Sequence, residues 1–259
     1  MNTEDMIIQE QEGHVGLLYL NRPEKRNALS LELLKELLKH LDQVALDPDI
    51  SVLILGARGT NFSSGHDLNE LVGGNCHSYR RLFHMCTQVM ERIQSLPQPV
   101  IAMVQGIATA AGCQLVATCD LVVASESARF ATPGVRIGYF CTTPMVAVSR
   151  SVGRKKALEM LLTGEDISAK EALAHGLINH VVPDRQLLEH TVSLAKKIAQ
   201  TPLSIIAGGK RAFYNQIEQS QSAAYRYAQE VMAVTALAEE AQEGIKAFLE
   251  KRPPKWTNG

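Results

Sequence analysis

The sequence predicts an α/β core followed by a helical last third. Short β-branched or leucine-rich runs alternate with helical patterns up to about residue 124, and the strand signal almost disappears from Arg154 onward. Strands that alternate with helices are typical of a largely parallel sheet buried on both faces. A chain of 259 residues is long enough for such a core and a smaller appendage. We divide it into an α/β core of residues 1–195 and a helical region of residues 196–259.

A strand–helix–strand unit opens the core. Val15–Leu20 and Val52–Gly56 are short apolar runs, and between them Ser30–Ala45 places leucines at positions 31, 34, 38 and 41. This spacing is the stripe of an amphipathic helix. The same alternation then predicts, in order, a helix at about 78–95, a strand at Val100–Val104, a helix from about 112 and a strand at Leu121–Ala124.

Residues 93–119 contain no charged side chain, so their length alone meets the requirement of ~20 residues for a membrane helix. Pro97, Pro99 and four glutamines within the segment argue against a membrane span. A buried strand, a turn and the start of a buried helix explain the segment better. We therefore expect no membrane partner.

The last third is predicted to be helical. Ser168 and Glu171 have the spacing of a capping box, which opens a helix. Pro253 and Pro254 end the final helix. Amphipathic segments lie between these points, at about 187–199, 204–217, 221–236 and 239–250. These helices are expected to pack on the core or on another subunit.

The composition of the chain indicates which partners and which cellular compartment to expect. The chain carries 26 Lys and Arg against 27 Asp and Glu, so no global field favours nucleic acid or an anionic membrane surface. Five cysteines without a CxxC spacing fit a reducing compartment better than a disulfide scaffold. The first residues are acidic and polar, unlike a secretory leader or a transit peptide. We expect a cytoplasmic protein without a targeting segment and without a nucleic-acid partner.

Two short stretches carry the clearest chemical signal, Phe62–Asp67 and Gly106–Asp120. Each places small residues where the chain must turn sharply. The backbone N–H groups of His66 and Ala111 could form a two-donor hole for a developing oxyanion, although the spacing equally allows two ordinary glycine turns. The sequence holds no dinucleotide fingerprint, P-loop, nucleophile elbow or zinc-type spacing, so we expect no metal site.

Five blocks of the sequence, in order, resemble the signature blocks of the crotonase (enoyl-CoA hydratase/isomerase) superfamily. Five blocks in the right order are far more specific than any one of them. The resemblance covers nearly the whole chain. The blocks are Asn21–Leu29, Phe62–Asp67, Gly106–Asp120, Phe130–Gly138 and Glu243–Arg252.

The resemblance implies a spiral of ββα units with a C-terminal helical trimerisation region. It also implies an acyl-CoA thioester as the partner, with its carbonyl oxygen between the N–H groups of His66 and Ala111. Coenzyme A would be part of the substrate, and no separate cofactor is expected. The expected assembly is a homotrimer or a dimer of trimers.

Contacts to coenzyme A follow from the same resemblance. The anionic coenzyme would meet basic side chains and the backbone after the first turn. Charge alone is weak evidence, and a solvated surface is the plain alternative for the basic residues. The predicted CoA-binding residues are Lys25, Arg26, Ala28, Ser64, Asp67, Leu68 and Lys251.

The proton-transfer machinery differs from that of the family. In hydratases of this family two glutamates carry the protons, and the matching positions here are Gln114 and Gly134. An amide cannot accept a proton near neutral pH, and glycine has no side chain. If the backbone hole is intact, replacing both residues by glutamate should restore part of a hydratase activity. Gly134→Glu would fail if that position needs a glycine-only conformation.

Other residues could replace the missing carboxylates. His66 titrates near neutral pH and lies at the predicted oxyanion turn. Cys141 is a candidate nucleophile, although a cysteine in an apolar pocket more often serves packing. Tyr139, Cys141 and Thr142 follow the Gly138 turn, where the family lines its acyl pocket.

Three functions remain open on the sequence. The first is an acyl-CoA enzyme that stabilises a thioester enolate in the backbone hole, with its reaction unspecified. The second is a decarboxylase-like activity, which needs an enolate hole and little else. The third is a catalytically silent acyl-CoA-binding protein, which the missing carboxylates would permit.

Overall fold

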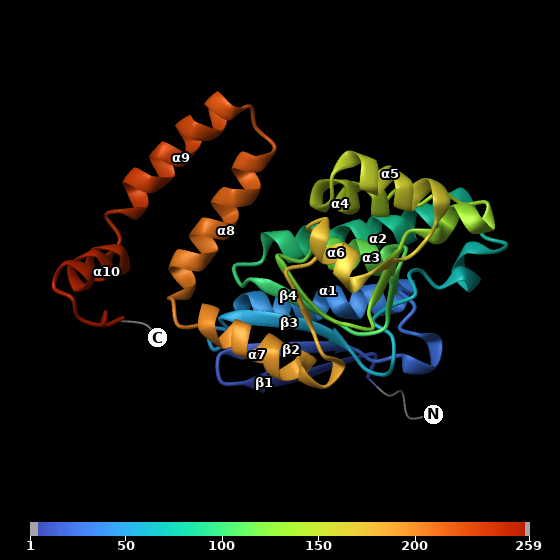
Figure 1. Cartoon of the computed structure of the whole chain (residues 1–259), viewed down its shortest axis with the longest axis horizontal. Helices are drawn as coiled ribbons and strands as arrows, with labels where there is room; N and C mark the ends of the chain where they lie inside the picture. The colour runs from blue at the N-terminus through green and yellow to red at the C-terminus, as the bar shows by residue number, and fades with distance from the viewer. Residues whose placement is uncertain (1–4, 257–259) are drawn as a thin grey trace.

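The computed structural model describes residues 5–256 and has an α/β core from which a helical arm projects (Figure 1). A six-stranded sheet runs in the order β1-β2-β3-β4-β6-β9. Only β1 is antiparallel to its neighbour. Its strands are β1 (Ile7–Glu12), β2 (Val15–Leu20), β3 (Val52–Ala57), β4 (Val100–Val104), β6 (Leu121–Ser125) and β9 (His180–Val182).

The central strands are buried on both faces. Every residue of β2, β3 and β4 is buried, which explains why their sequences read as continuous apolar runs. One face packs against α1 (Leu31–Leu46), α2 (Cys76–Ser95) and α3 (Ala111–Thr118), and the other packs against α7 (Leu187–Ile198). Side chains of one strand therefore alternate between two cores, as Leu53 and Ile54 do.

Local sequence signals set the helix boundaries. Ser30 accepts a hydrogen bond from the N–H of Leu33 and caps α1. The predicted capping box of Ser168 and Glu171 is confirmed at the start of α6. The remaining helices of the core are α4 (Pro144–Ser151), α5 (Arg154–Thr163), α6 (Ala169–Ala174) and four short 3₁₀ turns, η1 (Pro23–Lys25), η2 (Leu68–Leu71), η3 (Pro133–Ile137) and η4 (Asp184–Gln186).

A second, three-stranded sheet carries the turns of interest. It consists of β5 (Ile107–Thr109), β7 (Arg129–Ala131) and β8 (Ile167–Ser168). Gly106 joins β4 to β5 with a φ of +58°, and a Cβ there would lie 2.0 Å from the carbonyl oxygen of Thr60. Only glycine lets the chain pass from one sheet to the other so close to the segment that follows β3.

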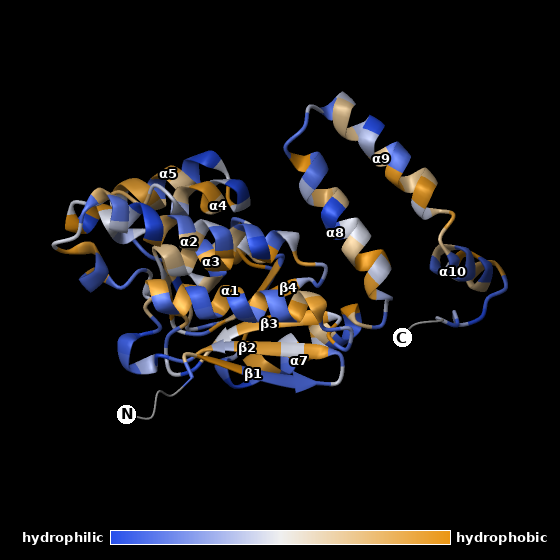
Figure 2. Ribbon diagram, turned by 180° about the vertical axis from the view of Figure 1, so that it is seen from behind, coloured by the Kyte–Doolittle hydropathy of each residue, from blue (hydrophilic) through white to orange (hydrophobic). Residues whose placement is uncertain are grey.

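The C-terminal arm consists of α8 (Leu203–Ile217), α9 (Gln221–Thr235) and α10 (Glu239–Leu249), and Figure 1 shows it projecting from the core. A buried ion pair anchors it: Lys210 Nζ lies 2.6 Å from Asp120 Oδ2, and the hydroxyl of Tyr214 donates to Asp120 Oδ1 at 2.8 Å. No residue of α8 or α9 is fully buried, and Figure 2 shows apolar stretches along both helices.

The structure confirms the predicted α/β architecture, the buried path of residues 93–119 and all four helical segments after residue 187. The short strands β1, β5, β7, β8 and β9 were not predicted. In β1 only Ile7 is buried, so the strand lacks a continuous apolar pattern. The proposed division at residue 195 falls inside α7, whose Ala195 packs against the sheet, and this boundary stays a prediction.

Candidate active site

The first turn, Phe62–Asp67, is held against β5 by backbone hydrogen bonds. The N–H of Ser63 donates to Ile107 O at 3.0 Å, and the N–H of Thr109 donates to Ser63 O at 2.9 Å. Gly65 has a φ of +90°, and a Cβ there would lie 2.8 Å from the Cβ of Ala110. With any residue other than glycine at position 65, the first turn could not approach the second turn so closely.

The second turn is the entry to α3. Ala110 has a positive φ of 50°, a costly conformation for a residue with a side chain, and it sends the chain directly into the helix. A Cβ on Gly112 would lie 2.5 Å from Ser63 O, so the first helical turn rests on the backbone of the first turn. The N-terminus of α3 favours negative charge at this point.

The two predicted oxyanion donors line one cavity. His66 and Ala111 both contribute to the wall of a cavity of about 380 Å³, which we call the main cavity. Within residues 5–256, neither backbone N–H donates a hydrogen bond to another group of the chain. A carbonyl oxygen polarised by backbone groups requires two such unused donors on one cavity wall.

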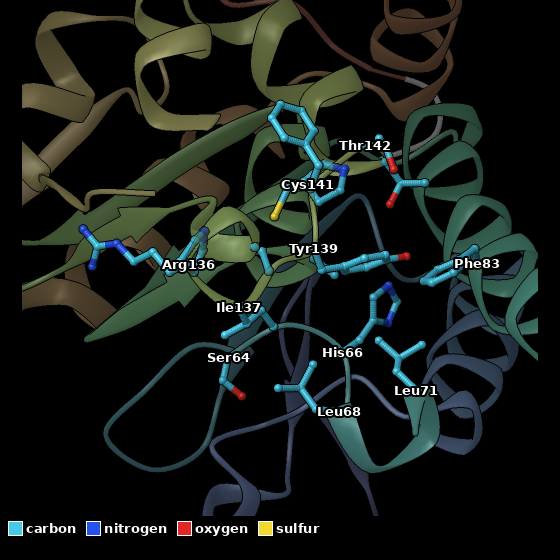
Figure 3. A pocket seen from close by; sticks show the side chains of 17 residues that line it. Ser64, His66, Leu68, Leu71, Phe83, Arg136, Ile137, Tyr139, Cys141 and Thr142 are labelled. Carbon is cyan, nitrogen blue, oxygen red and sulfur yellow. The ribbon is translucent and has the colours of Figure 1, made fainter. Parts of the chain in front are cut away.

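Figure 3 shows the main cavity from close by. Its wall is mostly apolar, and it contains no Asp or Glu among the described residues. Ser64 and Leu68, two of the predicted CoA contacts, belong to it, as do the predicted pocket residues Tyr139, Cys141 and Thr142. The other lining residues are Leu71, Phe83, Ala110, Pro133, Gly134, Arg136, Ile137, Phe140, Thr143 and Pro144.

A polar network that the sequence analysis missed joins the η1 loop to the first turn. Asn27 is fully buried, and its amide donates to the carbonyl oxygens of Arg58 and Asn61 at 2.9 Å each. The hydroxyl of Ser63 donates to Asn27 O at 2.8 Å. Only the family block Asn21–Leu29 hinted at this role, because a buried amide has no signature of its own in one sequence.

The predicted CoA contacts near this loop differ in exposure. Lys25 and Arg26 are exposed, and the N–H of Ser64 donates to Arg26 O at 3.0 Å, so the basic loop lies directly beside the first turn. Ala28 is buried. The carboxylate of Asp67 lies 3.8 Å from the guanidinium of Arg22, which also donates to the backbone of Ala28.

Lys251 is not brought to the main cavity within one chain. It follows α10 at the far end of the C-terminal arm, away from the core that carries Lys25 and Arg26 (Figure 1). A CoA contact from Lys251 would therefore need a second copy of the chain. That contact stays a prediction.

His66 offers an unpaired nitrogen to the main cavity. Its Nδ1 lies 3.3 Å from Leu29 O, which assigns the proton to Nδ1, and its Nε2 is buried with no hydrogen-bond partner among the described residues. The imidazole packs edge-on against Phe83 with 5.4 Å between ring centroids. Burial lowers the pKa of His66, so the ring is neutral near pH 7 and Nε2 carries a free lone pair.

Gln114 does not line the main cavity. Its side chain is buried and contributes to a different cavity of about 750 Å³, between α2, α3, α4 and α8. Its Oε1 has no hydrogen-bond partner among the described residues. The sequence analysis placed this side chain at the reacting centre, but its direction from α3 could not be predicted from position alone.

Gly134 lines the main cavity but has no room for a side chain. A Cβ there would lie 2.1 Å from Tyr139 O and 2.9 Å from Cys141 Sγ. We therefore expect Gly134→Glu not to give the predicted rescue on this backbone. The cause is crowding by the carbonyl of Tyr139, because the N–H of Tyr139 donates back to Gly134 O at 2.9 Å. A glycine-only φ plays no part.

Cys141 lies in the wall of the main cavity as a thiol. Burial raises the pKa of its side chain, so the nucleophilic thiolate is disfavoured near neutral pH. The side chain is 6% exposed and serves packing.

All five cysteines are free, and within residues 5–256 no group of three metal-ligating side chains could hold an ion. No helix of that range is long and apolar enough to span a membrane.

Comparison with known proteins points to one family. The model of the family described as enoyl-CoA hydratase/isomerase matches residues 10–259. A zebrafish (Danio rerio) protein named enoyl-CoA hydratase domain-containing protein 3, mitochondrial, is 47% identical over 258 residues, which cover 99% of this chain and 89% of that protein. The motifs of this chain resemble the same subgroup.

Solved structures agree with the sequence matches. A crystal structure of human enoyl-CoA hydratase domain-containing protein 3 aligns with a TM-score of 0.94 and 47% identity, covering 97% of this chain and 100% of that chain. An enoyl-CoA hydratase from Mycobacterium smegmatis aligns with a TM-score of 0.95 and 47% identity, covering 98% and 99%. Both alignments confirm the crotonase-like fold that the resemblance implied.

Proposed function

This chain belongs to the enoyl-CoA hydratase/isomerase family, whose members act on acyl-CoA thioesters, and from that premise we propose that its main cavity polarises a thioester carbonyl. The carbonyl oxygen would accept hydrogen bonds from the N–H groups of His66 and Ala111. The observation that carries this proposal is that both residues line one cavity and that neither N–H group has a hydrogen-bond partner within residues 5–256. The acyl group would lie against the apolar wall.

A carbonyl held in this way favours enolate formation. Negative charge that develops on the oxygen is met by two fixed dipoles and by the N-terminus of α3. Removing one such donor typically costs about 10²- to 10³-fold in rate. The hole alone lowers the barrier of several reactions without selecting one of them.

Proton transfer is where this chain would differ from a hydratase. Hydration needs a base for the attacking water and an acid for the α-carbon, and no carboxylate lines the main cavity among the described residues. His66 Nε2 is the one buried side-chain nitrogen of that wall without a hydrogen-bond partner in residues 5–256. We infer a reaction that needs the enolate hole and at most this single neutral base.

Decarboxylation of a malonyl-type thioester satisfies that condition. The bond between the α-carbon and the carboxylate breaks, carbon dioxide leaves, and the electron pair enters the thioester as an enolate. A water molecule then protonates the α-carbon, which gives the shorter acyl-CoA and leaves hydroxide to combine with the released carbon dioxide as bicarbonate. Cleavage of this bond needs no base. The absence of carboxylates from the described wall of the main cavity therefore supports a decarboxylase-like activity over hydration.

A screen of enoyl-, malonyl- and β-hydroxyacyl-CoA thioesters by mass spectrometry tests the proposal. Turnover of a malonyl-type ester above the buffer rate supports it. Binding of esters without any turnover supports the second candidate, a catalytically silent acyl-CoA-binding protein, for which the missing carboxylates are the motivating observation. Failure to bind any ester contradicts both candidates.

The oligomeric state is part of the proposal. Large apolar side chains on the C-terminal arm are exposed in a single chain, and they include Phe213, Tyr225, Met232, Leu237 and Phe248. Exposed apolar surface of this extent marks an interaction surface. We expect light scattering to report a trimer or a dimer of trimers at micromolar concentration, and a clean monomer would contradict this.

The compartment also needs a direct test. The zebrafish relative is named mitochondrial, which does not fit the cytoplasmic location expected from composition. The five cysteines without a CxxC spacing supported that expectation. Cell fractionation with an antibody against the chain would distinguish a cytoplasmic pool from an organellar one.

A further inference from the structure

A second cavity lies against the main cavity. It measures about 340 Å³, and we call it the outer cavity. Most of its lining is shared with the main cavity, so the two spaces adjoin along these residues. The shared residues are Leu68, Leu71, Phe83, Ile137 and Tyr139. Val72 and Tyr79 complete the outer cavity.

Tyr139 and Phe83 come to this boundary from opposite sides. Tyr139 follows η3, and Phe83 belongs to α2. Figure 3 shows the tyrosine ring extending toward Phe83 above His66. The backbone of Tyr139 is fixed by its hydrogen bond to Gly134 O, but its side chain is 48% exposed and its hydroxyl has no partner among the described residues. Removing this ring would leave the local backbone in place.

We propose that the rings of Tyr139 and Phe83 form a partition that limits acyl chain length. A short acyl group then ends in the main cavity. A longer group can enter the outer cavity only when the partition is opened. This inference rests on the proposed binding of an acyl-CoA thioester and adds the residues that determine the length of its chain.

The lining of the outer cavity also determines which kind of acyl-chain end can bind there. None of the residues assigned to the outer cavity is charged, and the hydroxyl of Tyr79 is already used, donating to Leu71 O at 3.1 Å and accepting from the N–H of Gly74 at 3.0 Å. A carboxylate entering this space would lose its hydration without gaining a cationic partner. The outer cavity therefore suits a hydrocarbon end.

Chain-length profiles of two variants test the partition. The affinities of butyryl-, octanoyl- and dodecanoyl-CoA are measured by calorimetry for the parent, Tyr139→Ala and Tyr139→Phe. Each newly buried methylene contributes about fourfold, so Tyr139→Ala should raise the affinity for dodecanoyl-CoA relative to butyryl-CoA by about tenfold or more. Tyr139→Phe keeps the ring and should keep the parent's profile.

Phe83→Ala opens the same partition from α2 and should shift the profile in the same direction. Thermal melts of all variants check folding. Because Tyr139 is half-exposed, we expect Tyr139→Ala to stay folded even if Phe83→Ala does not. In Tyr139→Ala, hexanoyl-CoA should bind about tenfold or more tightly than adipoyl-CoA, which differs by a terminal carboxylate.

The outcomes separate this inference from the proposed function. If the parent does not bind butyryl-CoA, the proposed function fails. If butyryl-CoA binds and all variants keep the parent's chain-length profile, the partition is overturned while the proposed function stands. A shift in Tyr139→Phe equal to that in Tyr139→Ala also overturns it, because the hydroxyl and not the ring would then control length.

Discussion

The two turns and the loop of residues 132–143 line the same main cavity, but they are built from different parts of the chain. The turns present backbone N–H groups, and their geometry is fixed by close contacts at Gly65 and Gly112. The loop presents side chains, and at Gly134 it presents none. Carbonyl polarisation and proton transfer are therefore separable functions of one cavity.

The difference has a physical basis. A backbone donor depends only on the path of the chain, so the identity of the side chain at position 66 or 111 can change while the donor stays. A proton carrier depends on a particular ionisable group at a particular place. In this chain the path of the turns is kept, and the space for a second carboxylate is filled by Tyr139 O.

The largest expected effect is a deficit in hydration. Each positioned acid or base commonly contributes about 10²- to 10⁴-fold, so crotonyl-CoA hydration should be at least about 10⁴-fold slower than in hydratases with both carboxylates. The Gln114→Glu, Gly134→Glu double variant should not recover it, because the first side chain lies outside the main cavity and the second has no room. Brisk hydration of crotonyl-CoA by the parent would contradict the claim that the proton-transfer groups for hydration are missing.

The next effect concerns His66 Nε2, the unpartnered side-chain nitrogen that could accept a proton. His66→Gln keeps the backbone N–H but removes the free lone pair of Nε2, so any turnover that uses this base should fall by about 10²-fold. The exposed His84 of α2 gives a matched control, and His84→Gln should keep the parent's rate. Unchanged turnover in His66→Gln would show that the hole acts without a base.

Substitution at the contact between the two turns should cost stability and binding together. In Gly112→Ala the new methyl group would lie 2.5 Å from Ser63 O, and overpacking of this kind costs about 1–3 kcal/mol. Urea unfolding measures this cost, and butyryl-CoA affinity should fall with it.

Gly209→Ala is the matched control for that substitution. Gly209 lies in α8 with no atom within 4 Å of its added methyl group, so the change should leave stability equal or slightly higher. If the two variants behave alike, the contact between the turns does not hold the hole in place.

The pH dependence of stability should report the burial of His66. Burial lowers its pKa in the folded chain below the usual value of 6.5, so the unfolded chain binds more protons in acid. Its contribution is fully present above pH 6.5 and is lost as the pH falls toward the lowered pKa. Urea unfolding at pH 5 and pH 7 should therefore differ less for His66→Gln than for the parent.

The sequence predicted the helices and turns that position the site better than the packing of side chains within it. Caps and apolar periodicity located the helices, and the glycines of Phe62–Asp67 and Gly106–Asp120 located both turns. The direction of Gln114 and the crowding at Gly134 depend on packing between segments far apart along the chain. Asn27 was missed because its partners, Arg58 and Asn61, lie more than thirty residues away.

The smallest effect is expected at the basic loop. The coenzyme's phosphates should make binding sensitive to salt, because exposed charges are screened. The Lys25→Ala, Arg26→Ala double variant should weaken CoA binding by about fivefold or less, as suits exposed pairs. Calorimetry at low and high salt measures both quantities. Parental affinity at both salt concentrations would place the phosphates elsewhere.

The most direct test of the hole compares two ligands that differ only at the carbonyl. Butyryl-CoA carries the thioester oxygen, and S-butyl-CoA replaces the carbonyl by a methylene. Two backbone hydrogen bonds from His66 and Ala111, at about 0.5–1.5 kcal/mol each, should make butyryl-CoA bind roughly tenfold more tightly in calorimetry. Equal affinity for the two ligands would show that the carbonyl is not held by these donors and would contradict the account.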